Sequence, residues 1–187
     1  MPKNLISVVA GCLVVWLGAL QLHAQTKFID KNGIVIFEAS EELFEEVKAT
    51  NETATVIFDA KNNQIASLVL VQGFQFKNSL MQEHFNENYA ESDIYPKAKF
   101  TGQLQDFDLE RLGADMMHVK LKGTLSFHGR DKEVSTTVQM QRIKDVLQMI
   151  GSFTVLPADF DIKIPKIVRN KIAKEVQVKI DFKLSKK

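Results

Sequence analysis

The chain of 187 residues is long enough for one domain, or at most two small ones, and its 24 Lys and Arg are balanced by 23 Asp and Glu. This charge balance lacks the basic excess of a nucleic-acid binder, so we predict no nucleic-acid partner. Cys12 is the only cysteine, which excludes disulfide scaffolds, cysteine nucleophiles and cysteine metal sites from the rest of the chain.

Residues 1–24 have the layout of a secretory signal peptide. Lys3 supplies a positive start, residues 5–20 are mostly apolar, and Ala24 is a small residue ahead of the predicted cleavage before Gln25. We therefore expect a periplasmic protein with a single domain over residues 25–187. The alternatives are a retained anchor, full secretion, or a lipoprotein lipidated at Cys12.

The first part of this domain predicts two short hairpins. The Asn32-Gly33 pair favours a tight turn in the first hairpin, and residues 61–63 form the turn of the second. Residues 41–49, between them, fit either a helical turn or a strand. The predicted strands are residues 28–29, 34–37, 55–59 and 65–71.

One amphipathic helix interrupts the strands. We predict that Ser79 caps its N-terminus, with Gln82 completing a capping box, and that the helix ends before Pro96. The spacing places three apolar side chains on one face as a lid over the interior: Met81, Phe85 and Tyr89.

The second part alternates apolar and polar residues over long runs, as strands with one buried face do. Residues 117–127 and 134–140 flank a predicted turn at residues 128–131 and predict a hairpin. The other long strands are predicted at residues 97–104, 148–155 and 176–184, and residues 157–173 form the longest irregular loop.

About eight strands with short connections indicate an all-β, antiparallel fold. Long strands are costly to leave unpaired at a sheet edge, and closure removes the edges. We therefore favour a closed eight-stranded barrel, with the helix covering one end, over an open sandwich.

The inward face of this barrel is apolar. An eight-stranded barrel either fills its interior with side chains or holds one small ligand, and the sequence leaves both possibilities open. Adaptable Met side chains and the inward Gly102, Gly123 and Gly151 favour a cavity, whereas glycines used for curvature fit a dry core. The predicted lumen and ligand-binding residues are Phe100, Leu104, Met117, Val119, Leu121, Leu125, Phe127, Val138, Met140, Met149, Phe153, Ile180 and Phe182.

Polar motifs offer little sign of catalysis. His84 with Glu83 or Glu87 is the nearest approach to a carboxylate–imidazole cluster, but we favour a solvated helix face, because one His with Glu neighbours is weak evidence for a metal site. His118 and His128 are expected at the surface. We predict no catalytic residue, no metal site and no cofactor.

The segments 74–89 and 95–102, with Gly123-Thr124-Leu125-Ser126-Phe127-His128-Gly129 and Lys132-Glu133-Val134, resemble the YceI-like lipid- and polyisoprenoid-binding family. The resemblance covers roughly residues 33–184. It implies a periplasmic, lipocalin-like barrel with a helix near one end. It also implies an elongated apolar lumen that holds an isoprenoid or fatty-acyl chain without catalytic residues.

The sequence thus predicts an exported, non-catalytic protein, monomeric or homodimeric, that binds a lipid or isoprenoid chain. One alternative is a small barrel enzyme that acts on an apolar substrate through His84. Another is an envelope stress or structural protein with a dry core. A basic stretch is a candidate for transient contact with an anionic head group or membrane surface, or is a solvated loop: Lys163, Lys166, Arg169, Lys171 and Lys174.

Overall fold

The computed structural model describes residues 27–41 and 44–187. The predicted signal peptide, its cleavage before Gln25 and the alternative lipidation of Cys12 all lie outside the described residues.

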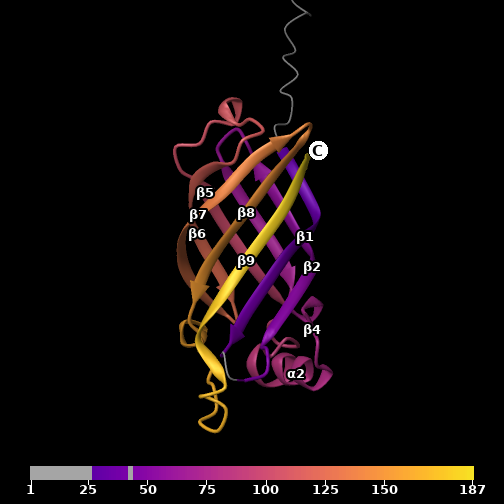
Figure 1. Ribbon diagram of the computed structural model, residues 1–187, viewed down its shortest axis with the longest axis vertical. Helices are drawn as coiled ribbons and strands as arrows, with labels where there is room; N and C mark the ends of the chain where they lie inside the picture. Colours follow the sequence, from indigo (N-terminus) through magenta and orange to yellow (C-terminus); the bar gives the residue numbers. More distant parts are fainter. Residues whose placement is uncertain (1–26, 42–43) are drawn as a thin grey trace, which may run out of the picture.

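Eight strands close into an antiparallel barrel (Figure 1). Their order is β1-β9-β8-β7-β6-β5-β3-β2, and pairing of β2 with β1 completes the ring. The predicted eight-stranded barrel is therefore confirmed. The strands are β1 (Lys27–Ser40), β2 (Lys48–Asp59), β3 (Gln64–Leu70), β5 (Lys97–Leu104), β6 (Met117–Phe127), β7 (Arg130–Ile143), β8 (Val146–Val155) and β9 (Ile172–Lys186). A two-residue strand, β4 (Gln75–Phe76), pairs with the start of β2.

The hairpin of β6 and β7 shows how the sequence pattern becomes structure. Val119 and Leu121 are buried, whereas the alternating Lys120 and Lys122 are exposed, because successive side chains point to opposite faces of a strand. His128 and Gly129 both adopt positive φ, which is typical of the two-residue turn whose twist matches a hairpin.

The predicted first hairpin is wrong, because β1 runs as one strand through Asn32-Gly33. Its pairing with β2 shifts register on either side of Gly33, so the Asn-Gly pair forms a bulge instead of a turn. The Asp30 carboxylate supports the bulge by accepting hydrogen bonds from the backbone N–H groups of Asn32 (2.9 Å) and Lys183 (2.7 Å). A Cβ at position 33 would lie 2.8 Å from the Phe182 ring, so glycine makes room for that ring.

Helix α2 (Ser79–His84) continues into a π-helical turn at Phe85–Tyr89 and lies at one end of the barrel (Figure 1). Its N-cap is Asn78, not the predicted Ser79. The Asn78 side chain accepts hydrogen bonds from the backbone N–H groups of Leu80 and Met81. These are the second and third residues of the helix, whose N–H groups an N-cap side chain binds. Gln82 does not complete a capping box, because its side-chain oxygen accepts a hydrogen bond from the backbone of Phe76 in β4.

No helix among the residues described is both long enough and apolar enough to span a bilayer.

The barrel end opposite α2 is filled with side chains. Phe58 packs against Phe28 and Phe107 with ring centroids 6.3 and 5.9 Å apart. The loop between β5 and β6 closes this end, since Phe107 and Leu112 are buried in the same core. The rest of this packed core includes Leu104, Met140, Leu147, Met149 and Leu184.

Candidate ligand-binding cavity

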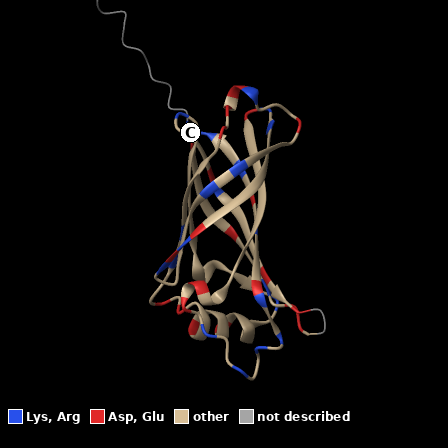
Figure 2. Ribbon diagram, turned by 90° about the vertical axis from the view of Figure 1, so that its left-hand side faces the viewer, with Lys and Arg blue, Asp and Glu red and all other residues tan. Residues whose placement is uncertain are grey.

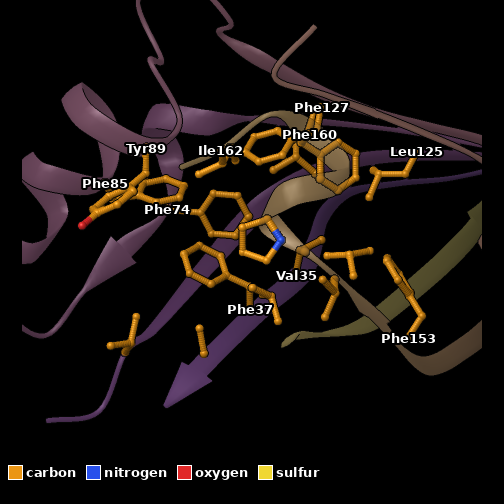
Figure 3. A pocket seen from close by; sticks show the side chains of 18 of the residues that line it. Val35, Phe37, Phe74, Phe85, Tyr89, Leu125, Phe127, Phe153, Phe160 and Ile162 are labelled. Carbon is orange, nitrogen blue, oxygen red and sulfur yellow. The ribbon is translucent and has the colours of Figure 1, made fainter. Parts of the chain in front are cut away.

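A cavity of about 430 Å³ occupies the barrel end nearest α2. Its size is within the range of small-molecule pockets, roughly 300–1,000 Å³, and its lining is dominated by apolar and aromatic side chains, as in such pockets. Figure 3 shows Phe85 and Tyr89 on one side of the cavity, and Phe127, Phe160 and Ile162 on another.

A cluster of four phenylalanines forms the helix side of the cavity. The ring of Phe37, from β1, lies 5.1 Å from those of Phe74 and Phe85, and 5.5 Å from that of Phe76. The rings of Phe76 and Phe85 are 5.2 Å apart. These offset and edge-on contacts hold the helix against the barrel with contributions of about 0.5–1.5 kcal/mol per pair. Phe37, Phe74 and Phe76 were not predicted as site residues, although the alternation of phenylalanines with polar residues was a signal in the sequence.

The loop after β8 forms another wall of the cavity, which was not among the predicted site residues. Phe160 ends a 3-10 turn (Pro157–Phe160), is 1% exposed, and packs edge-on against Phe127 at 5.6 Å. Ile162, Ile164 and Val168 follow it along the cavity lining. The alternation of these aliphatic residues with lysines was the signal in the sequence that could have found them.

His128 fastens this loop, so the prediction that it is a surface residue is wrong. Its Nδ1 lies 2.7 Å from the backbone oxygen of Phe160, and its Nε2 lies 2.7 Å from a carboxylate oxygen of Glu91. Its side chain is only 9% exposed, and the Tyr95 ring lies 4.5 Å away. The turn between β6 and β7 is thereby joined to two loops far from it in sequence.

Two ion pairs add to this attachment. Lys132 donates a hydrogen bond to Asp159 at 2.8 Å, and Arg130 pairs with Asp161. The hydrogen bond from the Lys132 ammonium lowers the pKa of the Asp159 carboxyl below its ordinary value. A hydrogen bond from Lys77 lowers the pKa of the Glu46 carboxyl in the same way.

The structure divides the predicted lumen residues into two groups. Seven line the cavity: Phe100, Leu121, Leu125, Phe127, Phe153, Ile180 and Phe182. Six point inward but do not line it, because they lie within or against the packed core: Leu104, Met117, Val119, Val138, Met140 and Met149. The three predicted lid residues all lie along the cavity: Met81, Phe85 and Tyr89.

The inward glycines do not provide open space. Gly102 of β5 and Gly123 of β6 face each other, and the Phe100 ring covers both, at 2.7 and 2.6 Å from where their Cβ atoms would lie. At Gly151 the corresponding space is taken by the Val138 side chain. The glycines therefore allow close packing of neighbouring side chains.

Few polar groups reach the cavity. Glu45, Asn78, Lys99 and Lys171 are among its lining residues, and His84 lies on the lining with an exposed side chain. Among the described residues, no group of three or more His, Cys, Asp or Glu side chains is arranged to hold a metal ion. In the described part of the chain, no carboxylate lies within hydrogen-bond distance of His84. Glu83, His84 and Glu87 are exposed side chains on helix α2 and its π-helical extension. The arrangement as a whole suits apolar binding better than acid–base chemistry.

A known family model matches nearly the whole length of the chain. The model of the YceI-like domain matches residues 20–184. The chain belongs to the YceI-like family. None of the curated proteins compared with this YceI-like chain matches it.

Solved structures share the YceI-like fold at low sequence identity. A polyisoprenoid binding domain from Saccharophagus degradans, implicated in plant cell wall breakdown, has 15% identity and a TM-score of 0.74, with 87% of this chain and 99% of that chain covered. Burkholderia cenocepacia BcnA has 15% identity and a TM-score of 0.65, with 81% of this chain and 96% of that chain covered. The Campylobacter jejuni YCEI protein has 14% identity and a TM-score of 0.62, with 77% of this chain and 87% of that chain covered.

Proposed function

We propose that this YceI-like protein is an exported, non-catalytic binder that holds a polyisoprenoid or fatty-acyl chain in its barrel cavity. It would serve carriage, storage or sequestration of that lipid in the periplasm. The observation that carries the proposal is the apolar cavity of about 430 Å³ at the α2 end. The family and the polyisoprenoid binding domain of similar fold support the same class of ligand.

The physical basis is burial of methylene groups. Each buried methylene contributes about 0.8 kcal/mol, so an extended chain is held without directional contacts once the costs of binding are deducted. The four-phenylalanine cluster and the loop wall at Phe160 shape the cavity, and only a few polar side chains are among its lining residues. Selectivity would therefore rest on cavity shape more than on hydrogen bonding.

The decisive measurement is native mass spectrometry of the protein purified from its own cell envelope. We expect a chain that begins at Gln25 and carries one stoichiometric lipid that organic solvent releases for identification. A protein mass without ligand that stays unchanged after incubation with geranylgeraniol and fatty acids would contradict the proposal. It would favour an envelope stress or structural protein whose core holds no ligand.

A cavity-blocking variant tests the location of the ligand. Ser67 lines the cavity, whereas Ser135 lies on the exposed outer face of β7. Ser67→Trp fills space for several methylenes, worth about 0.8 kcal/mol each, and we expect at least tenfold weaker binding of a dansyl-labelled fatty acid. Ser135→Trp, the matched control, should bind like the wild type. Equal binding by both variants would place the ligand elsewhere.

A further inference from the structure

The loop between β8 and β9 extends beyond helix α2 at the cavity end of the barrel (Figure 1). Residues 162–174, which run from this loop into the start of β9, contain five basic and no acidic residues. In Figure 2 several blue Lys and Arg positions lie along this loop. Within the described part of the chain, none of the five joins an ion pair: Lys163, Lys166, Arg169, Lys171 and Lys174.

The same loop has an apolar tip that faces away from the cavity. Ile167 is 83% exposed, the highest value among the exposed large apolar side chains of the described residues. Ile167 lies within the turn closed by the hydrogen bond from the Val168 N–H to the Pro165 carbonyl (3.1 Å), and a second turn follows, closed from the Lys171 N–H to the Val168 carbonyl (2.9 Å). A single exposed isoleucine is ordinary, but one placed among unpaired cations has the composition of a membrane-contacting loop.

The other side of the loop leads directly into the cavity. Ile162, Ile164 and Val168 are half-buried and line it, while Lys163, between the first two, is exposed. One short segment therefore joins an outward basic and apolar surface to the apolar interior. A chain that entered next to this loop would stay in contact with apolar side chains along its path.

The charges at this end also give an orientation. Helix α2 and its π-helical extension expose Glu83 and Glu87, whereas the loop is basic (Figure 2). An anionic surface would attract the loop and repel the helix, so the loop would approach it first.

We propose that loop 161–171 docks this protein on anionic phospholipid membranes. Ile167 enters the head-group region, and Lys163, Lys166 and Arg169 contact lipid phosphates. The docked loop then lets a chain pass between the bilayer and the cavity. This inference rests on the proposed function for its purpose, but the docking step is measurable without it.

The test is flotation with vesicles of phosphatidylcholine alone, or mixed with phosphatidylglycerol in a two-to-one ratio. The full mature protein should float with the anionic vesicles only, and less so at high salt, since surface charge is screened. Each loop cation near an anionic surface contributes about fivefold in affinity, so the triple variant Lys163→Gln/Lys166→Gln/Arg169→Gln should bind about 100-fold more weakly. Ile167→Ser should weaken binding at least tenfold.

A matched control uses the opposite end of the barrel. Ile143 is also exposed and precedes Lys144 in the turn between β7 and β8. Ile143→Ser/Lys144→Gln removes one apolar group and one cation there, and should float like the wild type. Vesicle binding that ignores lipid charge, or that both sets of variants reduce equally, would overturn the docking proposal.

A second readout separates docking from chain binding. The triple variant changes no residue of the cavity lining, so it should bind a dansyl-labelled fatty acid from solution as the wild type does. Loss of vesicle binding with fatty-acid binding retained supports docking. Wild-type protein that binds the fatty acid but not anionic vesicles refutes docking alone, whereas the reverse pattern refutes the proposed function alone.

Discussion

Replacement of His128 by alanine is expected to destabilise the protein and to weaken ligand binding together. His128 makes two contacts of 2.7 Å, one to the Phe160 backbone oxygen and one to the Glu91 carboxylate, from a side chain that is 9% exposed. Phe160 is fully buried and belongs to the cavity wall, so its carbonyl loses a partner where water has little access. The variant therefore affects the wall directly.

The magnitude follows from the two contacts. A buried hydrogen bond contributes about 1 kcal/mol, one to a charged group about 1.5–3 kcal/mol, and an unpaired buried acceptor adds its desolvation cost. The Glu91 side chain is 43% exposed and regains water in the variant, so the free energy lost with its hydrogen bond lies at the lower end of this range. We expect a loss of about 2–3 kcal/mol in the free energy of unfolding and, for a chain of this size, a fall of about 5–10 °C in Tm.

His118 supplies the matched control, because it is an exposed histidine on the outer face of β6 whose side chain makes one hydrogen bond among the described residues, with Gln139 at 3.2 Å. His118→Ala should change the free energy of unfolding by less than about 0.5 kcal/mol. Urea unfolding followed by circular dichroism measures both variants, and titration with a dansyl-labelled fatty acid measures the cavity. If His128→Ala unfolds and binds like His118→Ala, the role assigned to the His128 contacts is incorrect.

Two further predictions concern packing and charge. Gly123→Ala places a Cβ 2.6 Å from the Gly102 Cα and against the Thr101 backbone oxygen, so we expect a loss of about 3 kcal/mol or more in urea unfolding. Gly113→Ala meets nothing within 4 Å and should remain near the wild type; similar stabilities for the two variants would contradict this packing. Lys132→Met removes the hydrogen bond that lowers the pKa of Asp159, so that pKa should rise toward its ordinary value in an NMR titration. A carboxyl whose pKa is lowered by folding stabilises the folded state at pH values above its ordinary pKa, and this stabilisation is lost as the pH falls through the lowered pKa. The variant lacks this contribution, so it should show a smaller acid-induced loss of stability. An unchanged Asp159 pKa would disprove the pairing.

The strands and the barrel were predictable because they depend on local pattern. Alternation through residues 117–127 and 134–140 indicated both the strands and their inward faces, and the short glycine-containing turn between them indicated their pairing, although Arg130 and Asp131 of the predicted turn belong to β7. The helix was located within one residue of its cap, although Ser79 and Asn78 are both suitable capping residues and only the backbone geometry distinguishes them.

The Asn32-Gly33 pair shows where local reasoning ends. An Asn-Gly pair favours a turn in isolation, but here β2 and β9 pair with β1 on both sides and keep it extended. The Phe182 ring occupies the space left by Gly33, and this contact joins residues far apart in sequence.

The sequence by itself determined that the chain alternates with the period of strands, that its inward side chains are apolar and that a helix presents Met81, Phe85 and Tyr89 to the interior. Only the tertiary structure decided which inward residues fill the barrel and which surround a cavity. Strand periodicity specifies the face on which a side chain lies, whereas packing depends on side chains that approach from across the barrel. Phe107 and Leu112 fill one end, while residues 157–172 and the four-phenylalanine cluster surround a hollow at the other end.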